Sequence, residues 1–258
     1  MEHLREPHDG GWIEHALPDC SRPHIGHPVP VGVLGQKSGN AYLHWMEALI
    51  DLCAATGDPA VPRSLEEAVD LLSTHFYPAD ARAAEDILTR DWRPMNYANE
   101  TQISLGHNVE FAWLLLRAEQ VLGRTLSVDR LESYLDHALV TGFDETKGGL
   151  DTHPSSTCGR RAAPERSWRV QVELLACLIE ATEHTTPTSR YEEVLRQHLA
   201  FVFGRQADPQ DALWWEVVDE DGRIITPSKH HEWKAGYHEL RAITLLSERS
   251  SLRFQNGR

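Results

Sequence analysis

Hydrophobic residues recur at helical spacing, three or four positions apart, in seven segments of the chain. The predicted helices cover residues 40–53, 64–76, 106–123, 127–143, 165–183, 188–204 and 237–248. We expect the first helix to begin near Asn40, a residue type favoured at helix N-caps, and to end before Gly57 and Pro59. Ser64 and Glu67 are spaced as a capping box, which predicts the start of the second helix.

Apolar helices alternate with amphipathic ones along the chain. The segments 106–123 and 165–183 are apolar around most of their circumference, whereas the segment that follows each of them has one polar side. A helix that is apolar on all sides belongs inside a protein, and an amphipathic helix belongs at its surface. We therefore predict an all-α fold, a partial toroid of seven to eight helices in inner and outer pairs. One β-hairpin is expected at 214–225, turning at Asp221-Gly222.

A glutamate returns at a fixed interval in the predicted inner helices. Glu110 follows Glu47 by 63 residues, and Glu173 follows Glu110 by the same number. His44 and His107 each stand three positions before one of these glutamates. A long period with polar residues at one phase indicates repeated helical units that direct polar groups toward a common centre.

Composition narrows the range of functions. The net charge of −14, from 39 acidic and 25 basic residues, disfavours nucleic-acid binding, which requires basic surfaces. The four cysteines, Cys20, Cys53, Cys158 and Cys177, form no CxxC pair, so neither a disulfide framework nor a zinc ribbon is predicted. The N-terminus lacks the apolar stretch of a signal peptide, and we find no run long enough to span a membrane. We expect a single domain over residues 1–258, located in the cytoplasm.

The histidines and glutamates allow four interpretations. They could ligate a metal, although the order His-x-x-Glu is the reverse of that in di-iron helices. Two facing carboxylates could hydrolyse a glycosidic bond. His107 and His238 could act as acid and base on a carbon acid, because histidine exchanges protons near neutral pH. The same side chains could also serve only as polar caps at the helix starts.

Four segments in order resemble the N-acylglucosamine 2-epimerase superfamily. GHNVEFAWLLLRAEQVLG resembles its GH-x-x-E-x-x-W-L-L signature. KSGNAYLHWMEALIDLCAATGD resembles its N-x-x-x-H-x-x-E-A helix, PERSWRVQVELLACL its W-x-x-Q-x-E helix, and EWKAGYHELRA its E-W-K-x-x-Y-H-x-x-R segment. The resemblance implies an (α/α)6 barrel of twelve helices that inverts C2 of a reducing-end sugar, or moves its carbonyl from C1 to C2, through an enediol. It implies a sugar as the substrate and no cofactor or metal.

The resemblance also implies a role for each matching residue. His107 and His238 correspond to the proton acceptor and donor at C2, and His44 corresponds to the histidine that assists ring opening. The residues expected to bind or orient the sugar are Trp113, Glu110, Glu173, Trp168 and Trp233.

The family pattern begins earlier than this sequence does. Its first helices, and an arginine that polarises the sugar oxygens, would precede Met1, and Arg5 has no matching context. We therefore expect a fragment of a longer enzyme, a truncated gene product, or a partial barrel that another chain or a homo-oligomer completes. A glycan hydrolase or lyase on the same barrel, or an inactive sugar-binding protein, is the alternative expectation.

Overall fold

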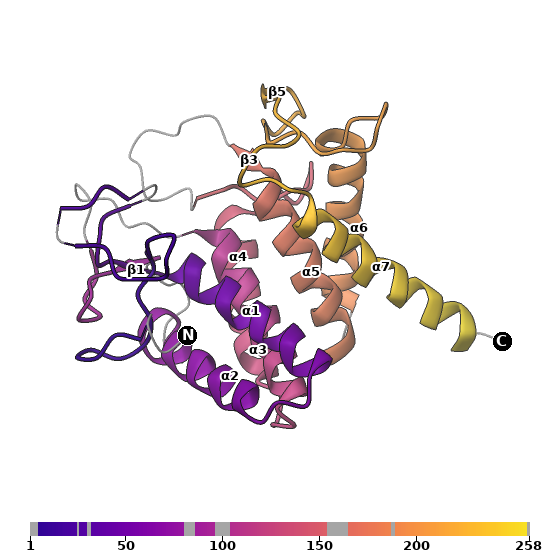
Figure 1. Cartoon of the computed structure of the whole chain (residues 1–258). Helices are drawn as coiled ribbons and strands as arrows, with labels where there is room; N and C mark the ends of the chain where they lie inside the picture. The colour runs from indigo at the N-terminus through magenta and orange to yellow at the C-terminus, as the bar shows by residue number, and fades with distance from the viewer. Residues whose placement is uncertain are drawn as a thin grey trace. The chain divides into compact units, whose positions relative to one another are not determined.

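The regular elements of the computed structural model in Figure 1 are mainly helices. The described residues are 5–24, 26–29, 32–79, 86–95, 104–153, 165–186 and 189–256. They form two compact units: the first contains Met1–Ile103 and Arg117–Leu126, and the second contains Ser104–Leu116 and Ser127–Arg258. The prediction of a single domain stays a prediction.

The first unit consists of two helices and a two-stranded antiparallel sheet. Its elements are β1 (Lys37–Ser38), α1 (Gly39–Ala55), α2 (Ala60–Leu71), the π-helical segment η2 (Leu72–Phe76) and β2 (Ile87–Leu88). Lys37 pairs with Leu88 in the sheet. Because β1 leads directly into α1, this pairing fixes where the helix starts.

The cap of α1 is Ser38 and not Asn40, which lies inside the helix. The Ser38 hydroxyl accepts a hydrogen bond from the backbone N–H of Ala41 at 3.1 Å. It also donates to the Glu14 carboxylate at 2.7 Å. The prediction of an Asn40 cap is therefore wrong by two residues, because the strand β1 places a serine at the position where the backbone turns into the helix.

The predicted capping box of α2 is also wrong. The helix begins at Ala60, four residues before Ser64, which lies within it. The carboxylate of Asp58 accepts a hydrogen bond from the backbone N–H of Ala60 at 2.8 Å. An earlier aspartate thus satisfies the helix start, and Pro59 next to it already has a helical φ of −68°.

The second unit holds the other helices and a three-stranded sheet. Its elements are α3 (Leu105–Val121, which continues into the first unit), α4 (Val128–Gly142), β3 (Arg166–Ser167), α5 (Trp168–His184), α6 (Ser189–Phe201), the π-helical segment η3 (Val202–Gln206), β4 (Val217–Val218), β5 (Ile224–Thr226) and α7 (Tyr237–Asn256). The predicted hairpin is confirmed, because β4 and β5 are antiparallel and Gly222 at their turn has a φ of +83°. The strand β3 extends this sheet by pairing with β4.

Burial follows the predicted alternation of inner and outer helices. All residues from 170 to 181 of α5 are buried, and α5 packs against α4, α6 and α7 (Figure 1). The stretch 108–116 of α3 is equally buried, whereas α4 and α6 each expose one side. On the final helix, Leu240 is 69% exposed.

Two further observations concern the described residues alone. No helix among them is both long and apolar enough to cross a bilayer. Three of the cysteines, Cys20, Cys53 and Cys177, are free thiols in these ranges. Cys158 lies outside the described residues.

Candidate active site

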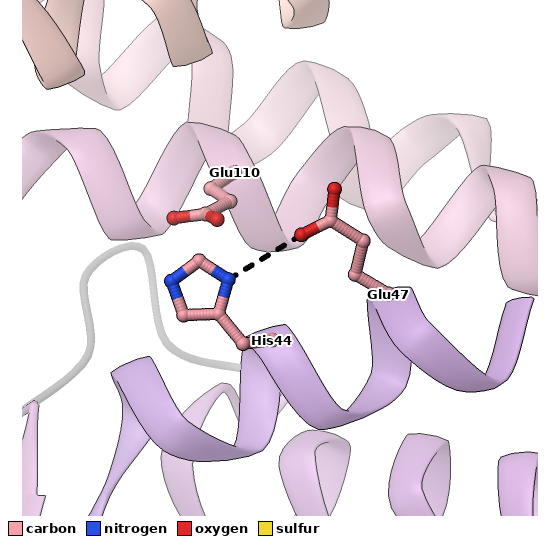
Figure 2. Close-up of side chains that lie close together, drawn as sticks. All are labelled: His44, Glu47 and Glu110. Atoms are coloured by element: carbon pink, nitrogen blue, oxygen red, sulfur yellow. Dashed lines mark hydrogen bonds and ion pairs between the residues drawn. The ribbon is translucent and has the colours of Figure 1, made fainter. Parts of the chain in front are cut away.

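The first unit contributes one histidine–glutamate pair. His44 and Glu47 stand one turn apart on α1, and the distance between Nδ1 of His44 and Oε2 of Glu47 is 3.3 Å (Figure 2). The side chain of His44 is 32% exposed. The third residue drawn in Figure 2, Glu110, belongs to the second unit.

In the second unit, Glu173 on α5 is the centre of a buried network. Its carboxylate accepts hydrogen bonds from Nε1 of Trp113 at 3.0 Å and from Nη2 of Arg241 at 2.7 and 2.9 Å. Nδ1 of His238 lies 2.8 Å from Oε1 of the same Glu173 carboxylate. Residues from α3, α5 and α7 thus meet at one fully buried carboxylate.

The contact with Glu173 sets the orientation of the His238 imidazole. A carboxylate oxygen only accepts, so the 2.8 Å contact favours the tautomer with its hydrogen on Nδ1 and the lone pair on Nε2. Nη2 of Arg241 lies 3.3 Å from the same Nδ1. The imidazole is held between two aromatic rings: Trp168 meets it edge to face at 5.4 Å, and Tyr237 lies over it at 3.9 Å. This buried, doubly supported ring has the geometry of a general acid or base.

A second pair, Glu110 with Arg169, joins α3 to the start of α5. Nη2 of Arg169 lies 3.3 Å from Oε2 of Glu110, whose side chain is completely buried. Burial opposes the charge on Arg169, but the carboxylates of Glu110 and Glu173 outweigh it and raise the pKa of the guanidinium. Arg169 therefore stays positively charged.

Glu173 experiences opposing influences. Burial, and next the negative charge of Glu110, raise the pKa of its carboxyl well above the ordinary value, although Arg169 and the Trp113 N–H lower it. The two hydrogen bonds from Arg241 also favour the charged carboxylate. Two guanidinium groups thus balance two buried carboxylates.

The ligand-type atoms of Glu110, Glu173 and His238 lie within 4.8 Å of one another, close enough to surround a metal ion. The carboxylates already bind Arg169 and Arg241, which supply the positive charge that an ion would bring. A cation in this place would therefore meet two fixed positive charges.

His107 occupies the first turn of α3 and is half-buried. Its backbone N–H donates to the hydroxyl of Ser104 at 3.2 Å, so a serine defines this end of the helix. Glu110 stands one turn further along the same helix. The predicted pair thus lies on α3 as expected, and the part His107 plays in catalysis stays a prediction.

The predicted sugar-binding tryptophans have different surroundings. Trp113 is buried, with the guanidinium of Arg241 4.6 Å from its ring centre. Trp168 is also buried, with the ammonium of Lys234 4.6 Å from its ring centre. Trp233 is 64% exposed in the loop before α7. Of these three rings, Trp233 offers an open face to a ligand.

Comparison with known proteins decides the family. The model of the N-acylglucosamine 2-epimerase (GlcNAc 2-epimerase) family matches residues 32–242. This chain belongs to that family. It is 24% identical over 227 residues to the cellobiose 2-epimerase of Eubacterium cellulosolvens, and the alignment covers 81% of this chain and 55% of the relative. It is 23% identical over 219 residues to the D-mannose isomerase of Marinomonas mediterranea, and this alignment covers 80% of this chain and 54% of the relative.

A solved structure of the family confirms the fold. The cellobiose 2-epimerase of Bacillus thermoamylovorans superposes with a TM-score of 0.82 at 19% identity, over 95% of this chain and 62% of that one. The predicted all-α fold of the (α/α)6-barrel type is thus confirmed. The chain spans about half the length of the curated relatives it matches.

For this N-acylglucosamine 2-epimerase family member, neither arginine of the network was given a role from the sequence, although Arg241 ends the E-W-K-x-x-Y-H-x-x-R segment. Arg241 lies three residues after His238 and Arg169 lies four residues before Glu173, so each shares a helix face with a predicted site residue. That spacing was the available signal. It could not show that Arg241 on α7 binds a glutamate on α5, because this contact is tertiary.

Proposed function

We propose that the chain acts as a carbohydrate 2-epimerase or aldose–ketose isomerase on the open-chain form of a reducing-end sugar. The observation that carries the proposal is the imidazole of His238, oriented by the buried carboxylate of Glu173 at 2.8 Å. Membership of a family of sugar epimerases and isomerases supports it.

The chemistry begins with the acidic C–H bond beside the sugar carbonyl. A base takes the C2 proton, the C2–H electron pair forms a C1=C2 double bond, and the carbonyl π electrons move to O1. Return of a proton to C2 from the opposite face gives the epimer. Proton transfer from O2 to O1, with a proton delivered to C1, gives the ketose. A base with a pKa near neutrality suits this step.

The resemblance to the epimerase family supports the following roles. His238 and His107 exchange the proton at C2 on the two faces of the sugar, and His44 assists ring opening. Glu173 orients His238 through Nδ1, and Glu110 holds Arg169. Trp233, with its open ring, provides a stacking surface for the sugar, to which Trp113 and Trp168 contribute as substrate-binding residues. The route needs no cofactor.

Hydrolysis is less well supported. A glycosidase needs one protonated carboxyl that donates to the glycosidic oxygen and a second that faces the ring. Glu110 and Glu173 are fully buried and held by arginines, so neither presents a carboxyl to a ligand in this way.

The test is incubation of the 258-residue chain with mannose, glucose, N-acetylglucosamine and cellobiose in D2O, followed by NMR. The proposal predicts that at least one sugar loses its C2–H signal and that an epimer or ketose appears. Calorimetry with the same sugars separates the alternatives. Binding without exchange would identify a sugar-binding protein, and reducing-end release from cellobiose would identify a hydrolase.

A further inference from the structure

The network contains two guanidinium groups in different surroundings. Nη2 of Arg241 donates to both oxygens of Glu173, and its guanidinium carbon lies 4.6 Å from the ring centre of Trp113 and 5.7 Å from that of Tyr237. Its side chain is 17% exposed. Arg241 is therefore committed to holding Glu173.

The side chain of Arg169 is more exposed than that of Arg241. Its side chain is 27% exposed, and its contact with Glu110 is longer, at 3.3 Å. It follows Trp168, which contacts the His238 ring, directly in sequence. Its guanidinium thus lies within the same network as the proposed proton-transfer group, and its side chain is more exposed than that of Arg241.

The position of Arg169 does not serve the stability of its helix. It is the second residue of α5, where the helix dipole is positive, so a cation there is unfavourable by roughly 0.3–1 kcal/mol. The carboxylates of Glu110 and Glu173 offset this repulsion. A charge kept at an unfavourable place in the helix, beside the site, indicates a role toward a ligand.

Enolisation supplies a ligand that needs such a charge. When the C2–H bond breaks, its electron pair moves into the C1=C2 bond and negative charge develops on O1. A preorganised cationic donor stabilises this oxygen more in the transition state than in the ground state. A guanidinium provides two parallel N–H donors that suit the two adjacent oxygens of an enediolate.

Resting on the function proposed above, we propose that Arg169 is a catalytic residue that donates hydrogen bonds to O1 and O2 of the enediolate, and that Glu110 positions it. The proton from C2 goes to the histidine base, the C2–H electron pair forms the C1=C2 bond, and the carbonyl π electron pair moves to O1. Arg169 remains protonated throughout. The step therefore needs no further reactant.

The first test compares Arg169→Met, Arg169→Lys and Arg169→Ala with the unaltered chain in the C2 exchange assay. Removing one oxyanion donor lowers kcat by about 10²–10³-fold, so we expect losses of this size in the Met and Ala variants. The Lys variant keeps the positive charge but lacks the two parallel N–H donors of a guanidinium, so we expect kcat to fall by about tenfold. Added guanidinium ion should restore activity to Arg169→Ala, a result that a merely structural role would not give.

The matched control is Arg190→Met, which removes an exposed arginine on α6 that pairs with Asp136 at 3.0 Å, and its rate should equal that of the unaltered chain. Thermal unfolding shows whether each variant is folded. If the Met variant does not fold, the Lys variant decides, and an unchanged kcat in that variant overturns the proposal. A folded Met variant within threefold of the unaltered rate, or an Ala variant that guanidinium does not rescue, also overturns it.

A second measurement separates this inference from the proposed function. An aldonohydroxamate is a planar, anionic mimic of the enediolate, and calorimetry measures its binding to each protein. Arg169→Met should bind it at least tenfold more weakly, about 1.4 kcal/mol. Suppose that the unaltered chain exchanges the C2 proton and that the Met variant binds the hydroxamate equally well. This result rejects only the role of Arg169 and leaves the proposed function standing. Neither exchange nor hydroxamate binding by the unaltered chain rejects both proposals.

Discussion

Two histidine–glutamate pairs in this chain consist of the same residue types but differ in burial and in the contacts that hold them. His44 and Glu47 are neighbours on one helix, 3.3 Å apart, and the imidazole is 32% exposed. His238 and Glu173 come from different helices, lie 2.8 Å apart and are almost fully buried. The first pair depends on local helix geometry, whereas the second depends on tertiary packing that also includes Trp113 and Arg241.

This difference separates the roles that the two pairs suit. A partly exposed pair on one helix stabilises it by only a few tenths of a kcal/mol. A buried pair surrounded by donors holds one orientation, because any other would leave charges without partners. His238 is therefore suited to transfer a proton at a fixed carbon, and His44 to proton movement at the more mobile ring oxygens.

The largest effect on stability is expected from Glu173→Gln, which removes the charge shared by His238 and Arg241. Breaking a buried ion pair on one side costs about 3–5 kcal/mol of stability, and we expect the exchange rate to fall by about a hundredfold. Urea unfolding and the C2 exchange assay measure the two losses. Glu248→Gln, on an exposed position of α7, is the control. A Glu173→Gln chain as stable and active as the control would show that the network does not support His238.

A third histidine extends the comparison, because its hydrogen-bond partner is a backbone carbonyl and not a carboxylate. His198 is as buried as His238, and its Nε2–H donates to the Gln171 carbonyl at 2.8 Å. Burial lowers the pKa of His198 from 6.5 to about 4. The unfolded chain therefore binds a proton between these values that the folded chain excludes, so this contribution to stability is complete above pH 6.5 and is lost as the pH falls to 4.

The shift in the pKa of His198 amounts to about 3 kcal/mol over that window. Urea unfolding of the unaltered chain and of His198→Gln at pH 7 and pH 4.5 measures it. The stability of the unaltered chain should fall by about this amount more than that of the variant. Equal pH dependence in the two proteins would show that the imidazole is not held neutral.

The smallest effect is expected from His44→Gln. Because its contact with Glu47 is local and partly exposed, the free energy of unfolding should change by less than about 0.5 kcal/mol. The rate of C2 exchange should fall by about tenfold, as expected for lost acid–base assistance in ring opening. A stability loss as large as that of Glu173→Gln would contradict the contrast between the pairs.

The sequence predicted the parts of the molecule that depend on periodicity. The helices α3, α5 and α7 are present, and the spacing of Glu110 and Glu173 marked the buried carboxylates. The caps of α1 and α2 were placed wrongly because several serines and aspartates compete for each helix start. The strands β1, β2 and β3 have two residues each, too few for alternation to show. The contacts of Arg241 and Arg169 arise from packing between helices, which no local pattern encodes.

The exchange of the sugar C2 proton with solvent in His238→Ala and His107→Ala tests the central claim most directly. With the sugar that reacts with the unaltered chain, NMR in D2O gives the rate of C2–H loss in each protein. The account predicts that each substitution abolishes epimerisation or isomerisation and lowers exchange by about a thousandfold, while thermal unfolding shows a folded chain. Folded variants that both exchange the C2 proton at the unaltered rate would contradict it.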